Sequence, residues 1–282
     1  MKNKQKRKTL SWVANIGMAI VCLIALFPVI MLLISSLRPS SELMRTGISL
    51  AFDWSTLNID NYNYIFTQAA GYWTWYTNSL VISAVTIVLS LFFSAMVGYA
   101  LAVYDFKGRN LFFTFVVFIL MVPFEILMLP LFQMMITASL VDSYLGVILP
   151  MVVAPIAVFF FRQYALGLPV QLMDAARIDG ATEYGIYFKI MLPLMGGPSL
   201  GAMAILQGLG SWNNFLWPLI VLRSNDMFTL PIGLATLLTP YGNNYDVLIA
   251  GSVMTIVPII ILFIFFQRYF VAGLTTGGGV KG

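Results

Sequence analysis

Polar side chains recur on one face of an otherwise apolar stretch near the C-terminal third of the chain. Gln207, Ser211 and Asn214 are spaced at i, i+4 and i+7, which places them on one side of a helix, and Trp212 and Asn213 lie beside them. Amides exchange hydrogen bonds with hydroxyl groups, and an aromatic ring can stack on the C–H face of an uncharged sugar. Because unpaired amides are costly in lipid, the pattern predicts either a substrate path or hydrogen bonds between helices at a dimer contact.

One carboxylate, Glu125, also lies in an apolar run, between Pro123 and Pro130. An ionisable group inside a membrane costs at least about 2.5–3.5 kcal/mol and usually faces water or the protein interior. Glu125 is therefore a second candidate for a substrate path, and a position near the outer end of its helix accounts for it equally well.

The chain lacks most of the groups that catalysis uses. It has no histidine, its single cysteine, Cys22, lies in an apolar run, and no G-x-x-x-x-G-K-[ST] motif occurs. These absences argue against a histidine general base, a thiolate zinc cluster, an internal disulfide and a phosphate-binding loop. We expect no enzymatic activity, no cofactor and no metal, and any ATP hydrolysis would belong to a separate subunit.

The composition indicates a membrane protein. Of 282 residues, 60% are hydrophobic and 9% are charged, and the mean hydropathy is +0.91. Several runs reach the roughly 20 apolar residues that a membrane helix needs. We predict an all-α polytopic membrane protein with six transmembrane helices, at residues 11–36, 76–103, 111–135, 143–165, 198–222 and 246–270.

The distribution of positive charge predicts the orientation of these helices. Of the 15 Lys and Arg residues, only Arg38, Arg45 and Arg223 fall in the segments on the far side from the N-terminus. By the positive-inside rule, the basic tail 1–10, the loop 166–197 and the glycine-rich tail 271–282 are cytoplasmic, and the loops 37–75 and 223–245 are external. The prediction is a multi-pass plasma-membrane protein with both termini in the cytoplasm, and the basic pI does not indicate nucleic-acid binding.

The loop from Leu168 to Pro198 is unusually charged for this chain. It contains Asp174, Arg177, Asp179, Glu183 and Lys189. Pro169 can open a first short helix with Leu172, Ala175 and Ala176 on one face. Gly180 is expected to end this helix. Thr182 can cap a second short helix, which Pro193 and the cluster Gly196-Gly197-Pro198 are expected to end. The pair forms a compact projection suited to a groove on another protein; the alternative is a solvated loop with helical tendency.

Several motifs of this chain resemble those of carbohydrate ABC-importer permeases of the maltose-permease type. Asp174-Ala175-Ala176, Asp179-Gly180-Ala181 and Ile190-Met191-Leu192-Pro193 are similar to the EAA loop of that binding-protein-dependent family, with Asp174 in place of the usual Glu. Further similar stretches are Asn61-Tyr62, Asn78-Ser79, residues 105–109, Trp212-Asn213-Asn214 and the closing glycines. Residues 159–166 and 213–219 resemble the arabino-oligosaccharide permeases of Gram-positive bacteria.

The resemblance implies a type I ABC-importer permease fold and a set of partners. Such permeases pair with a second homologous permease, two ATPase subunits and an external solute-binding protein, and together they carry an oligosaccharide across the bilayer. It implies that Asp174, Ala175, Ala176, Asp179 and Gly180 dock on the ATPase, and that Gly278 and Gly279 reach toward the ATPase pair. Two alternatives remain open from the residues alone: an ion-coupled secondary sugar carrier, and a membrane scaffold with no transport role.

Overall fold

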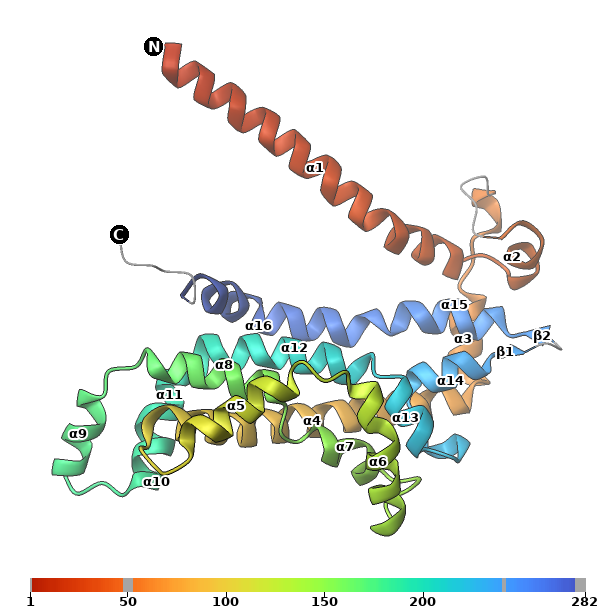
Figure 1. Ribbon diagram of the computed structural model, residues 1–282. Helices are drawn as coiled ribbons and strands as arrows, with labels where there is room; N and C mark the ends of the chain where they lie inside the picture. Colours follow the sequence, from red (N-terminus) through yellow and green to blue (C-terminus); the bar gives the residue numbers. More distant parts are fainter. Residues whose placement is uncertain (1, 48–52, 240–241, 277–282) are drawn as a thin grey trace. The chain divides into compact units, whose positions relative to one another are not determined.

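The computed structural model describes residues 2–47, 53–239 and 242–276, and these are almost entirely helical (Figure 1). The chain divides into two compact units. One unit comprises residues 1–72 with 234–256, and the other comprises residues 73–233 with 257–282.

The first unit combines the N-terminal helices with a later segment of the chain. Its core is polar as well as apolar: the buried side-chain amide of Asn61 donates to the carbonyl oxygens of Ser36 and Arg38, at 2.8 and 2.9 Å. The hydroxyl of Tyr72 donates to the carbonyl oxygen of Gly251 at 2.9 Å, which ties the two segments together. The elements of this unit are α1 (Lys2–Ser36), α2 (Ser40–Thr46), η1 (Trp54–Thr56), α3 (Asp60–Thr67), the two-residue strands β1 (Leu238–Thr239) and β2 (Gly242–Asn243), and α15 (Tyr245–Met254).

The second unit contains the candidate site residues that the structure describes. It is built around α4 (Ala70–Val103), which begins in the first unit. The elements that follow are α5 (Arg109–Ile119), α6 (Phe124–Thr137), α7 (Tyr144–Ile148), η2 (Leu149–Met151), α8 (Pro155–Leu166), α9 (Gln171–Ile178), α10 (Glu183–Ile186), η3 (Tyr187–Met191), α11 (Leu192–Met195), η4 (Gly196–Leu200), α12 (Gly201–Trp212), α13 (Leu216–Val221), η5 (Asn225–Met227), α14 (Leu230–Thr236) and α16 (Ile256–Thr276).

Within the described ranges, three helical segments are long and apolar enough to cross a membrane: Ala14–Ser36, Ala70–Val103 and Val247–Tyr269. Two bent helix pairs raise this number to five if each pair is one span. The predicted span 198–222 is divided between α12 and α13. The count of six spans therefore stays a prediction.

Prolines shape the two bent pairs. The run 111–135 predicts one helix, but α5 and α6 meet at an angle of 106°, with Pro123 immediately before α6. A proline supplies no N–H and disfavours helical geometry in the residue before it, so the helix breaks there. The bend predicted from Pro150 and Pro155 is confirmed, because η2 and α8 are separated by a break with a bend of 40°.

Small residues on α4 bring α8 into close contact with it. Ser94 is fully buried, and its hydroxyl oxygen accepts a hydrogen bond from the backbone N–H of Ala154 at 3.1 Å. One turn later, a Cβ atom at Gly98 would lie 2.8 Å from both the Cβ of Phe161 and the carbonyl oxygen of Val158. Ser94 and Gly98 therefore serve helix packing.

Replacing Gly98 with alanine is expected to lower the stability by about 1–3 kcal/mol, because α8 must move away to admit the methyl group. The matched control is Gly210→Ala on α12, where an added Cβ meets no atom within 4 Å. That substitution is expected to stabilise its helix by about 0.5–1 kcal/mol. Thermal unfolding of the purified variants in detergent compares them, and equal melting temperatures would contradict the prediction.

The second short helix of the charged loop does not end at Pro193, so that prediction is wrong. The backbone stays helical from Glu183 to Trp212. A π-helical turn, η3, directly precedes the turn that contains Pro193, and Pro198 lies within a second one, η4. The wider i→i+5 bonding of a π turn lets the helix continue past a residue that has no N–H. We call the helical segment from Glu183 to Trp212 the rod.

Candidate functional site

Helices α9 and α10 pack together as a hairpin at one end of the second unit (Figure 1). Met173 and Ala176 anchor α9, since both are buried in a core that includes Tyr99 of α4, Phe161 of α8 and Ile186 of α10. The three residues that the sequence places on one face of this helix differ in burial: Ala176 is buried, but Leu172 and Ala175 are exposed. On a helix of only two turns, apolar residues on both sides leave the buried side undetermined by periodicity.

Four apolar side chains on the two helices of the hairpin are exposed. Ile178 and Tyr184 have 86% and 75% of their surfaces exposed, and Leu172 and Ala175 are exposed beside Ile178 on α9. We call Leu172, Ala175, Ile178 and Tyr184 the apolar face of the hairpin. Ile178 and Tyr184 are absent from the residues singled out in the sequence, although Leu172, Ala175 and Ile178 repeat at intervals of three and mark one side of a helix.

Local capping chemistry fixes the turn between the two helices, as the sequence predicts. Helix α9 ends at Ile178, and Gly180 then adopts a φ of +80°, a conformation that favours glycine. The Thr182 side chain accepts a hydrogen bond from the N–H of Gly185 at 3.1 Å and so caps α10. Asp179, between α9 and Gly180, is exposed.

Arg177 holds the hairpin together electrostatically. Its Nη1 donates to Asp174 Oδ1 at 3.1 Å, and its Nε and Nη2 donate to the two carboxylate oxygens of Glu183 at 2.7 and 3.2 Å. Tyr104, which follows α4, donates its hydroxyl to Glu183 Oε2 at 2.8 Å. The Arg177 guanidinium, and then the Tyr104 hydroxyl, lower the pKa of Glu183 below its ordinary value, so this carboxylate is ionised at neutral pH.

The residues of the predicted polar stripe lie on the second half of α12 and just after it. Gln207, Ser211 and Asn214 are half-buried, and Asn214 lies just beyond the helix. The exposed Asn213 turns its side-chain amide back to donate to the carbonyl oxygen of Leu209 at 2.9 Å. Half-buried amides at a helix end can hydrogen-bond an uncharged polar ligand or a neighbouring helix.

Glu125 does not join this group through any direct interaction. It is exposed in the first turn of α6, and within the described ranges its side chain makes no hydrogen bond or ion pair. A carboxylate in the first turn of a helix is favourably placed for the helix dipole, which accounts for its position without a ligand.

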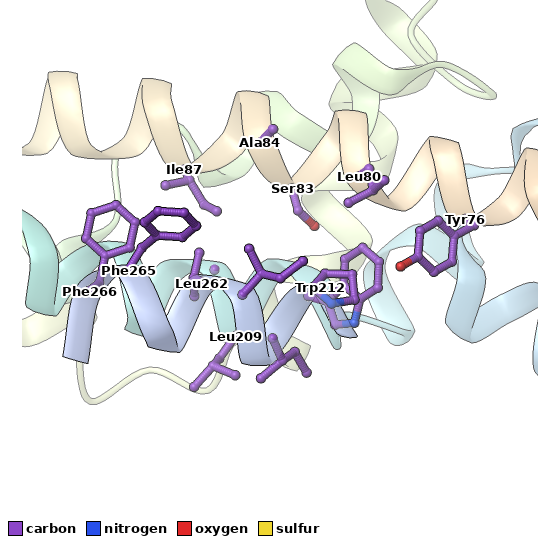
Figure 2. Close-up of a pocket in the computed structure, with 14 residues that line it drawn as sticks. Tyr76, Leu80, Ser83, Ala84, Ile87, Leu209, Trp212, Leu262, Phe265 and Phe266 are labelled. Atoms are coloured by element: carbon purple, nitrogen blue, oxygen red, sulfur yellow. The ribbon is translucent and has the colours of Figure 1, made fainter. Parts of the chain in front are cut away.

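A cavity of about 390 Å³ lies between α4, α12 and α16 (Figure 2). Of the predicted path residues only Trp212 lines it, and the edge-to-face contact between Trp212 and Tyr76, at 5.7 Å between ring centroids, forms one end. The other walls are almost wholly apolar, apart from the hydroxyl of Ser83. Such a cavity suits an apolar group, whereas a sugar would need more hydrogen-bonding partners.

Gly278 and Gly279, the remaining predicted site residues, lie outside the described residues. Among the residues that are described, no three or more His, Cys, Asp or Glu side chains are grouped closely enough to hold a metal ion.

Comparison with known proteins identifies the family. Residues 90–276 match the family described as "Binding-protein-dependent transport system inner membrane component". The chain is 75% identical over 280 residues to the arabinooligosaccharides transport system permease protein AraQ of Halalkalibacterium halodurans, covering 98% of this chain and 100% of that protein. It is 62% identical over 260 residues to AraQ of Bacillus subtilis, covering 92% of each chain. It is 33% identical over 267 residues to the lactose transport system permease protein LacG of Rhizobium radiobacter, covering 94% of each.

The fold also matches a solved structure. A chain from the crystal structure of a bacterial ABC transporter involved in the import of the acidic polysaccharide alginate superposes with a TM-score of 0.79 and 23% identity, covering 93% of this chain and 97% of that one. This match shows that the two chains share a fold, which confirms the predicted fold class. The chain belongs to the family of inner-membrane components of binding-protein-dependent transport systems.

Proposed function

We propose that this chain is the permease subunit of an ATP-driven, binding-protein-dependent importer of oligosaccharides, with arabino-oligosaccharides as the substrate. The 75% and 62% identity to two AraQ permeases over nearly the whole chain supports both the reaction and the sugar. A second homologous permease, two ATPase subunits and an external solute-binding protein complete the transporter in this proposal.

The main structural observation that supports an ATP-driven mechanism is the apolar face of the hairpin. An exposed isoleucine and an exposed tyrosine lie on two short helices whose opposite sides are anchored in the core. Exposed apolar side chains grouped on a rigid support are typical of a protein interaction site. The ATPase is the proposed partner, and its movement on binding ATP passes through the hairpin to the membrane helices.

The orientation of the chain follows from the same proposal. The hairpin and both termini lie in the cytoplasm, where the ATPase is, and six spans connect them. The concentration of Lys and Arg in the tails and in loops on this side supports that orientation. The glycine-rich C-terminal segment with Gly278 and Gly279 is a second proposed contact with the two ATPase subunits.

Co-purification from native membranes tests the proposal directly. A tagged copy of this chain is expected to retain an ATP-hydrolysing subunit and a second permease. Liposomes containing that complex are expected to take up arabinotriose only with ATP inside and the binding protein outside. Uptake by this chain without an ATPase, or uptake that follows a proton or sodium gradient instead of ATP, would overturn the proposal in favour of a secondary carrier.

The polar stripe on α12 is the proposed substrate path. Changing Gln207 and Asn214 together to leucine is expected to lower arabinotriose uptake by about 5- to 150-fold, because each lost hydrogen bond to a sugar hydroxyl contributes about 0.5–1.5 kcal/mol. The same chemical change at Gln133 and Asn110, exposed amides on α6 and α5, is the matched control.

Both double variants are expected to retain the ATPase on purification, and the control is expected to transport normally. Wild-type uptake by the Gln207→Leu, Asn214→Leu variant would assign the stripe to contacts between helices instead.

A further inference from the structure

One carboxylate joins three separate elements on the hairpin side of the second unit. Glu183, at the start of α10, accepts from Arg177 at the end of α9 and from Tyr104 at the end of α4. Tyr104 and Glu183 are 79 residues apart in the sequence, and their oxygen atoms are 2.8 Å apart. A hydrogen bond to an ionised, hydrogen-bonded carboxylate is among the stronger polar contacts in a protein.

The packing around this bond is loose enough for movement. Tyr99 contacts both Tyr104 and Tyr187, with ring centroids 5.7 and 5.0 Å apart. A cavity of about 300 Å³ opens beside these rings, between the end of α4 and the hairpin. Its lining includes Glu183 and Tyr184. Side chains next to such a space can shift without compressing a close-packed core.

The hairpin is connected to α12 and to α4 in different ways. It is continuous with α12 through the rod, so displacement of α10 is carried to α12 by the helix backbone. Helix α4 has no such covalent connection to the hairpin. Besides packing, its direct polar contacts in the described ranges are the Tyr104–Glu183 bond and a weak contact from the Tyr99 hydroxyl to Met173 sulfur at 3.8 Å.

We infer that Tyr104 is a positioning residue, which ties α4 to the hairpin through Glu183 so that α4 and α12 move together when the ATPase moves the hairpin. The inference rests on the proposed function, since it requires an ATPase that acts on the hairpin. It assigns the main polar contribution to this coupling to one hydroxyl group, which lies outside the charged loop and acts in addition to the packing of Tyr99 against the hairpin.

The test is Tyr104→Phe in the complete transporter, which removes the hydroxyl and keeps the ring. The measured quantity is arabinotriose taken up per ATP hydrolysed by the complex in liposomes. We expect this ratio to fall about three- to tenfold while the ATPase still co-purifies in wild-type amount, since the hydrogen bond is to a charged carboxylate that is partly screened by solvent.

Tyr187→Phe is the matched control. Tyr187 belongs to the same ring cluster and is buried, but its hydroxyl has no hydrogen-bond partner among the described residues. Removing that group is expected to leave the uptake ratio unchanged. A normal ratio in Tyr104→Phe would show that Tyr104 acts by packing alone. An equal fall in both variants would show that the fall does not come from the bond to Glu183. Either result would overturn the inference.

Glu183→Ala tests the same bond from the hairpin side. It also removes the ion pair with Arg177, so it is expected to lower the ratio at least as much as Tyr104→Phe does. The double variant is expected to lose no more than Glu183→Ala alone, because the Tyr104 bond is already absent in that variant. Additive losses would overturn the inference. If Tyr104→Phe fails to accumulate in the membrane, Glu183→Ala alone serves as the test, and a normal uptake ratio in that variant would overturn the inference. Failure of the wild-type chain to bind any ATPase would instead contradict the proposed function.

Discussion

Replacing Ile178 with glutamate is expected to abolish ATP-dependent uptake and leave the chain folded in the membrane. The side chain is 86% exposed, so the substitution removes no core contact. In a complex with the ATPase, the variant loses the burial of an isoleucine, about 1.5–3 kcal/mol, and also buries an unpaired carboxylate. We expect binding of the ATPase to weaken at least 100-fold, measured by its retention on the tagged permease during purification.

Two variants control for the effect of the substitution. Ile178→Leu keeps an apolar side chain of equal volume and is expected to retain the ATPase. Ile59→Glu makes the same change at another exposed isoleucine, at the start of α3, and is also expected to retain it. Retention of the ATPase by Ile178→Glu at the wild-type level would show that the apolar face of the hairpin is not the docking surface.

Features of the hairpin that depend on neighbouring residues were predictable from the sequence. A threonine that caps a helix bonds to an N–H three residues later, and a glycine that ends a helix acts through its own φ angle. Thr182 and Gly180 therefore appear in the structure in the predicted roles. The bend between η2 and α8 was predictable for the same reason, since proline acts on its own backbone and on the residue before it.

Features that depend on distant residues were not predictable in this way. Whether Ala175 or Ala176 is buried depends on Tyr99 and Phe161, which come from other helices. Likewise, the hydrogen bond between Glu183 and Tyr104, which follows α4, depends on how the helices pack. Pro193 misled the prediction because the cost of its missing N–H is relieved by π turns, which no short motif identifies.

Substitutions at Gly180 are expected to impair transport in a graded order, with asparagine mildest, alanine intermediate and proline most severe. The φ of Gly180 is +80°, and an added Cβ meets no atom within 4 Å, so the backbone angle alone decides the outcome. A left-handed conformation costs most L-residues about 1–2 kcal/mol, and asparagine tolerates it best. Proline fixes φ near −65° and removes the N–H that donates to the carbonyl oxygen of Arg177 at 3.1 Å.

The expected consequence is loss of hairpin geometry, because the turn at Gly180 sets the orientation of α9, which carries Ile178, relative to α10, which carries Tyr184. We expect Gly180→Pro to abolish both ATPase retention and arabinotriose uptake, and Gly180→Asn to keep most of both. The membrane helices do not depend on this turn, so all three variants are expected to accumulate in the membrane at similar levels. Full uptake by Gly180→Pro would mean that the ATPase does not require this arrangement of the two helices, and equal impairment by asparagine and proline would attribute the effect to side-chain bulk instead of backbone angle.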